Sequence, residues 1–163
     1  MAVVNRWADA LVEAGKKTDA LNAAMGELAV MSVTLETVAT ESNTSIYKLA
    51  RIPSNWVPLK VEIHSDAITG ATSYALGFYE EDGTTVVDVD ELMAATDIHA
   101  GNAIGSPLDG MSAVGIANLG KKVWELLGKT INNKAESYVL ALTAAVVGTA
   151  AGTINVTAYF AKG

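Results

Sequence analysis

Hydrophobic and polar residues alternate with a period of two along most of the chain. The clearest case places Val57, Leu59, Val61 and Ile63 in alternation with Pro58 and three polar residues. Successive side chains of a strand point to opposite faces, so this pattern predicts a strand with four aliphatic residues on one face. Pro58 cannot donate a hydrogen bond to a neighbouring strand, so we expect the strand to begin there or to lie at a sheet edge.

Similar alternation predicts about seven strands in all. The others span residues 28–38, 45–52, 74–78, 121–127, 138–142 and 154–160. Gly148 and Gly152, in the turn-forming sequence "GTAAGT", suit a hairpin between the last two strands. Strands separated by turn sequences predict a mainly β fold, an antiparallel β-sandwich or jelly-roll-like domain, with one short helix at residues 89–96.

The first 25 residues follow a different period. Trp7, Leu11 and Ala14 recur at spacings near 3.6, in a segment rich in the helix formers Ala, Leu, Glu and Lys. Gly15 interrupts the pattern, so one continuous helix is not expected. Two interpretations remain open: a helix packed on the end of the domain, or a helical or extended arm that docks on a neighbouring subunit. We therefore divide the chain into an N-terminal arm, 1–25, and a β-sandwich domain, 26–163.

A long loop is predicted at residues 101–120. The sequence "GNAIGSPLDGMSAVGIANLG" is rich in glycine and contains one proline. A loop of this length in a compact domain is usually functional or disordered.

Composition excludes several functional classes. The net charge of −7 argues against nucleic acid as the main partner, because adjacent basic residues occur only at 16–17 and 121–122. No apolar run reaches the length of a membrane helix, and the first residues lack the order of a signal peptide, so we expect a soluble protein that binds no membrane. The absence of cysteine excludes disulfides, thiolate metal sites and a cysteine nucleophile.

Six carboxylates gather in the sequence "EEDGTTVVDVDE". They are Glu80, Glu81, Asp82, Asp88, Asp90 and Glu91. The spacing does not match a calcium-binding EF-hand loop, which has oxygen ligands at alternate positions and a central glycine. The sequence "EDG" instead favours a hairpin turn with Gly83 in the left-handed conformation, and Asp88 or Asp90 could cap the short helix. A solvated turn with a helix cap is thus the main interpretation, and an adventitious Ca²⁺ site the alternative.

Nothing in the sequence predicts catalysis. His64 and His99 are the only histidines, and no nucleophile elbow of the G-x-S-x-G kind accompanies them. We expect a protein without enzymatic activity, cofactor or metal. In the predicted strand at 121–127, Trp124 and Leu126 lie on one face and Val123 and Leu127 on the other. A strand that is apolar on both faces would be central or covered by a partner chain. The candidate interface residues are Trp124 and Leu126 of this strand, together with Trp7 and Leu11, the largest apolar residues of the arm.

The order of these segments resembles that of the head decoration (cement) proteins of tailed bacteriophages. The resemblance covers residues 27–160 and rests on "YALGFYEEDGTTVVDVDELMAATDI", "KKVWELLG" and "SYVLALTAAVVGTAAGTINVTAYF". It implies a structural virion protein, made in the host cytoplasm and located on the capsid surface, where it stabilises the head. The implied partners are the major capsid protein and further copies of this chain, with a homotrimer favoured. A phage tail or spike component, or a carbohydrate- or receptor-binding β-sandwich module with Tyr79 and Trp56 as candidate aromatic platforms, is the alternative.

Overall fold

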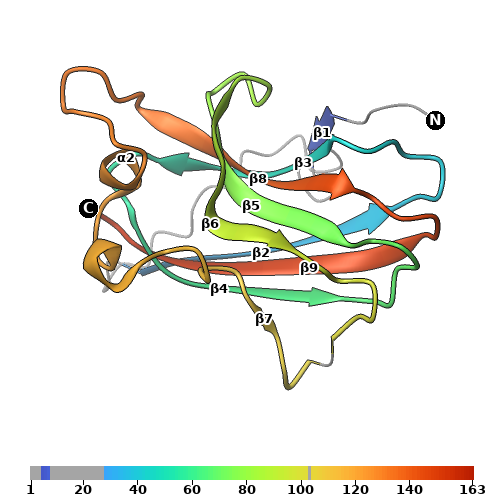
Figure 1. Cartoon of the computed structure of the whole chain (residues 1–163). Helices are drawn as coiled ribbons and strands as arrows, with labels where there is room; N and C mark the ends of the chain where they lie inside the picture. Colours follow the sequence, from blue (N-terminus) through green and yellow to red (C-terminus); the bar gives the residue numbers. More distant parts are fainter. Residues whose placement is uncertain (1–4, 8–27, 103) are drawn as a thin grey trace.

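The chain forms two packed β-sheets, as the computed structural model shows for residues 5–7, 28–102 and 104–163 (Figure 1). One sheet contains, in order, β1 (Asn5–Trp7), β3 (Ser45–Pro53), β8 (Ser137–Val146), β5 (Ser73–Tyr79) and β6 (Val86–Thr96). The other contains β2 (Leu28–Thr37), β9 (Gly152–Ala161), β4 (Val57–Ser65) and β7 (Leu108–Asp109). Neighbouring strands are antiparallel except β1 and β3. The predicted mainly β, sandwich-like fold is confirmed.

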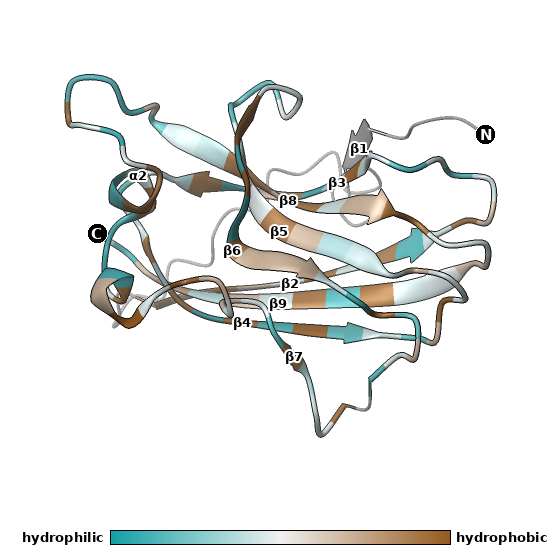
Figure 2. Ribbon diagram, in the orientation of Figure 1, coloured by the Kyte–Doolittle hydropathy of each residue, from teal (hydrophilic) through white to brown (hydrophobic). Residues whose placement is uncertain are grey.

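The core lies between the sheets and follows the predicted alternation. In β9, Ile154, Val156, Ala158 and Phe160 are at most 1% exposed, and the ribbon alternates between hydrophobic and hydrophilic segments (Figure 2). Tyr138, Leu140 and Leu142 of β8 face the same core. Each large aliphatic or aromatic side chain buried here contributes roughly 1.5–3 kcal/mol, so the period-two pattern selects both the strands and the faces that pack together.

A bulge changes the facing of β4. The pairing of β4 with β9 shifts between Pro58 and Lys60. Because the extra residue reverses the alternation, Pro58 is buried and Leu59 is 51% exposed. The prediction of four aliphatics on one face is wrong at Leu59 and at Val57, which pairs with Ala161 while Pro58 pairs with the core residue Phe160. The prediction that the strand begins near Pro58 is confirmed.

Residues 89–96, predicted as a helix, belong to strand β6. Across β5, the partner of Leu76 is Met93 and the partner of Phe78 is Asp88, so β6 bulges widely over Gly77. A β-carbon at Gly77 would lie 2.1 Å from the carbonyl oxygen of Asp88, so only glycine admits this crossing. Strand pairing here overrides the helix propensity of the sequence.

The opposite error occurs at residues 121–127, where the predicted strand contains the helical turn α2 (Val123–Leu126). The Glu125 carboxylate accepts a hydrogen bond from the Lys122 backbone amide at 2.8 Å, which caps the first turn. Gly128, at φ 63°, ends it. A single helical turn with apolar residues on two sides looks like a short two-faced strand in sequence, and this explains the error.

The last two strands do not form the predicted hairpin. β8 and β9 lie in different sheets, so the segment between them crosses from one sheet to the other. Gly148 has the expected positive φ, 95°, and packs against the segment around Thr69, whose carbonyl oxygen would lie 2.8 Å from an added β-carbon. The glycine is therefore needed for a close backbone approach at a crossover.

A buried polar cluster links β3 and β5. Glu41 is 2% exposed and accepts a hydrogen bond from the Tyr47 hydroxyl at 2.5 Å and another from the Val38 amide at 3.3 Å. The ring of Tyr47 stacks on Tyr74 with centroids 6.4 Å apart, and the Tyr74 hydroxyl donates to the Val147 carbonyl at 3.0 Å. Burial, which disfavours the phenolate, raises the pKa of Tyr74 to about 12. No pattern in the sequence indicates this cluster.

None of the helices in the described residues combines the length and the apolar character needed to cross a membrane.

Candidate functional site

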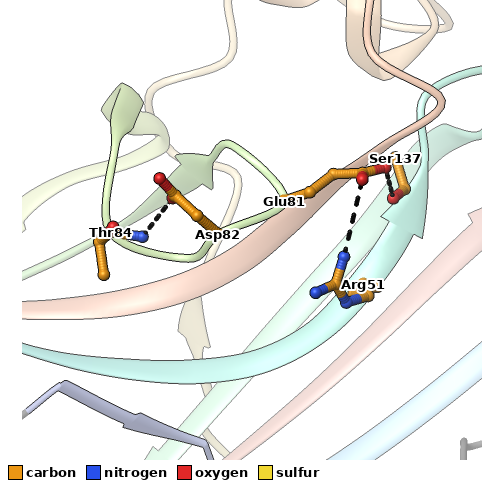
Figure 3. Close-up of polar contacts among 5 residues, drawn as sticks. All are labelled: Arg51, Glu81, Asp82, Thr84 and Ser137. Carbon is orange, nitrogen blue, oxygen red and sulfur yellow. Dashed lines mark hydrogen bonds and ion pairs between the residues drawn. The ribbon is translucent and has the colours of Figure 1, made fainter.

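The acidic segment between β5 and β6 begins with a tight turn. Asp82 accepts a hydrogen bond from the backbone amide of Thr84 at 2.7 Å (Figure 3). It accepts two more from Thr85, from the backbone amide at 2.8 Å and from the hydroxyl at 2.7 Å. These bonds to the charged form hold the pKa of Asp82 well below its ordinary value. Gly83 has φ 66°, so the predicted left-handed turn is confirmed.

Glu81 ties this turn to the sheet. Its carboxylate accepts a hydrogen bond from the Ser137 hydroxyl at 2.7 Å and lies 4.0 Å from the guanidinium of Arg51 (Figure 3). Both charged side chains are about half exposed, and pairs of this kind contribute little net stability. Glu81 therefore connects the turn to the sheet through Ser137 and Arg51, and these contacts are structural ones at the protein surface.

Glu80 lies in the same turn, where its amide donates to the Thr85 carbonyl at 2.9 Å, and the other three carboxylates, Asp88, Asp90 and Glu91, lie in the bulge of β6. Asp88 accepts from the amide of Asp90 at 3.2 Å, which closes a local turn and replaces the predicted helix cap. Burial and the nearby negative charges of Asp88 and Asp90 raise the pKa of Glu91 to about 7, with Lys121 acting in the opposite direction. The hydrogen bond with Asp88 raises the pKa of Asp90 as well. Asp88 is therefore close enough to Asp90 and Glu91 to disfavour the ionisation of both carboxylates.

The carboxylates and histidines do not converge on a metal-binding arrangement. Within the described residues, no group of three His, Asp or Glu side chains is placed to hold a metal ion. The Nε2 of His64 lies 3.0 Å from the carbonyl oxygen of Ile104, and the Nδ1 of His99 lies 2.6 Å from Asp97. The backbone and side-chain bonds from His99 lower the pKa of Asp97. His64 thus contacts the loop that follows Asn102, and His99 contacts Asp97 within its own loop.

The loop at residues 101–120 is anchored along β4. Asn102 accepts a hydrogen bond from the Ser65 amide at 2.7 Å and donates to the Ile63 carbonyl at 2.8 Å. Further along, the Gly110 amide donates to the Val61 carbonyl at 2.9 Å, and the short strand β7 pairs with β4. The base of this loop is therefore part of the four-stranded sheet.

Away from these anchors, the loop presents large apolar side chains to solvent. Ile104 and Ile116 are each 89% exposed and Leu119 is 58% exposed. Singly exposed aliphatics are ordinary on a protein surface, so the exposure of these residues makes them available for a contact without by itself marking one. We call these three residues the loop tips. The glycine-rich sequence predicts the loop but not which of its residues project.

Of the candidate interface residues, Trp124 and Leu126 are half-buried in α2 and pack against the main core. The two-faced strand proposed for Trp124 is wrong, because the residue lies in a helix. Trp7 ends strand β1, and Leu11 lies outside the described residues, as does most of the predicted arm. Their role in an interface stays a prediction.

Comparison with known proteins identifies structural neighbours. No protein-family model matches the chain, and no curated protein sequence matches it. A chain in the structure of the capsid of Ralstonia phage GP4 superposes with a TM-score of 0.57 at 15% identity, over 83% of this chain and 84% of that one. A chain in the capsid asymmetric unit of cyanophage Pam1 gives a TM-score of 0.53 at 14% identity, over 85% and 86%. At these identities the comparison establishes a shared fold, which extends over most of all three chains.

Proposed function

We propose that this protein is a structural virion component that decorates and stabilises the outside of a tailed-phage capsid as an oligomer. The fold shared with chains of two phage capsid structures, over more than four-fifths of each chain, carries the proposal. The motif resemblance to decoration proteins supports it. The partners would be the major capsid protein and further copies of this chain, and the role requires neither catalysis nor a cofactor.

The loop tips are the described residues best suited to contact a capsid. Ile104, Ile116 and Leu119 are exposed, and their loop is hydrogen-bonded to β4 at Asn102 and Gly110. Binding through a loop that is already anchored avoids part of the entropy cost of fixing a free segment. On a symmetric shell, repeated modest contacts reinforce one another when subunits are linked. We propose that this loop and the arm at residues 1–25 contact the capsid protein or adjacent copies.

The preference for a homotrimer rests on the resemblance to decoration proteins. The argument from a two-faced strand at Trp124 no longer supports it, because α2 packs against the core of its own chain. The number of copies in the oligomer is therefore a quantity for light scattering to measure.

The alternative of a carbohydrate-binding module gains no support from the two candidate platforms. Tyr79 is 1% exposed, and its hydroxyl is within hydrogen-bond distance of the Thr143 hydroxyl at 2.7 Å. Trp56 is half-buried against Phe160, with ring centroids 6.1 Å apart. Sugar binding requires aromatic faces open to solvent, so these residues serve the fold instead.

Addition of the purified protein to capsids that lack it tests the proposal. The double substitution Ile104→Ser with Ile116→Ser removes two loop tips, and Ile131→Ser is the control because Ile131 is 73% exposed outside this loop. We expect the control to bind as the unaltered protein does. The double variant should bind at least about tenfold more weakly, since a loss of roughly 1.4 kcal/mol of contact energy gives that factor. Full binding by the double variant would refute the role of the loop, and failure of the intact protein to bind would refute the decoration role.

A further inference from the structure

The four strands at the sheet edges differ in how they are protected. Exposed edges invite pairing with other chains, and natural proteins prevent this with short strands, bulges, charges or proline. Among the described strands, β7 has two residues and β1 has three. β6 has three register shifts against β5 and carries three carboxylates. Three of the four edges are therefore poor templates for a further strand.

Strand β2 has none of these protections. Its ten residues pair with β9 without a register shift, from Leu28 opposite Ala161 to Thr37 opposite Gly152. Its sequence, "LAVMSVTLET", has no proline or lysine and one charged residue, Glu36. In the part of the chain that the structure describes, no strand pairs with the other edge of β2. A long, regular and nearly uncharged edge of this kind is a template for strand addition.

We propose that β2 pairs antiparallel with β2 of a second copy, around a twofold axis at Ser32, so that two four-stranded sheets become one continuous sheet. A twofold axis brings the same strand from both copies together. Pairing centred on Ser32 places each residue opposite one of the same face, so buried side chains of both copies stay on the core side. The inference does not rest on the proposed function, because it concerns association of the protein alone. A twofold contact joins two copies, so it departs from the homotrimer that the resemblance implies.

The side chains match in this register. Opposite pairs across the axis would be Leu28 with Glu36, Ala29 with Leu35, Val30 with Thr34, and Met31 with Val33. No like charges face each other, and the β-branched pair Val30 with Thr34 lies on the outer face, where such pairs are favourable. Beside it, Ser32, Thr34, Asn155 and Thr157 form an uncharged hydrogen-bonded patch. The outer face at the centre of the proposed contact therefore carries no charge, and the one charged residue of β2, Glu36, lies near its end.

A second copy fits this edge better than the chain's own N-terminal segment. Residues 8–27 are rich in Ala, Leu, Glu and Lys, which favour helix over strand. They also contain adjacent lysines, Lys16 and Lys17, and lysine at a sheet edge opposes strand pairing.

Cross-linking provides the first test, because the chain contains no cysteine. Opposite residues of an antiparallel pair have Cα atoms about 4.5–5.5 Å apart, within the range that a disulfide spans. Ser32→Cys should therefore give disulfide-linked dimers on mild oxidation of the full chain. Leu59→Cys is the control, since Leu59 is 51% exposed on the same sheet but on β4. Linkage of Ser32→Cys no faster than that of Leu59→Cys would overturn the proposal.

Sedimentation equilibrium provides the second test. Val30→Lys with Thr34→Lys would place two lysine pairs face to face across the axis, and we expect it to weaken self-association about tenfold. The control, Leu59→Lys with Ile131→Lys, adds the same charge at exposed positions outside β2 and should associate as the unaltered protein does. Equal weakening in both variants would overturn the proposal. Slow hydrogen exchange along the β2 edge in a protein that sediments as a monomer would also overturn it, because the edge would then be filled within one chain.

Discussion

The buried hydroxyl of Tyr47 offers a sharp test of how the core is held together. Tyr47→Phe removes a donor to the carboxylate of Glu41, which is 2% exposed and keeps its bond from the Val38 amide. A hydrogen bond to a charged group contributes about 1.5–3 kcal/mol, more than a neutral one, because its loss leaves a buried charge less well solvated. We therefore expect the substitution to reduce the free energy of unfolding by about 2 kcal/mol.

Tyr79→Phe is the matched control. Tyr47 and Tyr79 are each 1% exposed, but the Tyr79 hydroxyl is hydrogen-bonded at 2.7 Å to a neutral group, the hydroxyl of Thr143. Removal of a neutral hydrogen bond costs about 1 kcal/mol. For a chain of this size these losses correspond to falls in Tm of about 4–8 °C for Tyr47→Phe and about 2–4 °C for Tyr79→Phe.

Thermal unfolding followed by circular dichroism at pH 7, with both variants at equal concentration, measures the difference. If Tyr47→Phe costs no more than Tyr79→Phe, the Tyr47–Glu41 bond does not have the strength of a charge-assisted bond, and the reasoning from burial and charge is wrong.

Three further predictions concern the acidic segment and the strand beneath it. The pKa of Glu91 in the folded protein is raised to about 7, so its contribution to stability is present below its unfolded pKa and is lost as the pH rises through 7. Glu91→Gln should therefore have the same Tm as the unaltered protein near pH 4.5 and a higher Tm at pH 8. Equal Tm values at pH 8 would contradict this. Removal of divalent ions with a chelator should leave Tm unchanged, whereas a fall reversed by Ca²⁺ would reveal a metal site in the acidic segment. Gly77→Ala would drive a β-carbon to 2.1 Å from the Asp88 carbonyl oxygen, so we expect a loss of folded protein on expression, while Gly105→Ala, at an open position, should express normally.

The sequence was most informative where the burial of a residue depends only on its position along its own strand. The alternation in 154–160 identified β9 and its buried face, because Ile154 and Phe160 need only the period of two to reach the core. The turn at Gly83 was predictable for a similar local reason, since "EDG" encodes a left-handed residue.

Two of the errors occurred where a distant segment decides the structure. Residues 89–96 have helix propensity, and pairing across Gly77 makes them a strand; the glycine within "YALGFY" was the available signal for that crossing. The segment after β8 looks like a hairpin turn, but its direction depends on which sheet β9 joins. The bond between Tyr47 and Glu41 and the exposure of Ile104 and Ile116 depend on three-dimensional placement, which no periodicity reports.

Quantification of this chain in purified virions tests the central proposal most directly. A protein that decorates a symmetric shell occupies equivalent positions, so the account predicts many copies per head in a fixed ratio to the major capsid protein. Those copies should be accessible to protease or antibody on intact particles. Absence from virions, or recovery of a few copies only in tail fractions, would contradict the proposal.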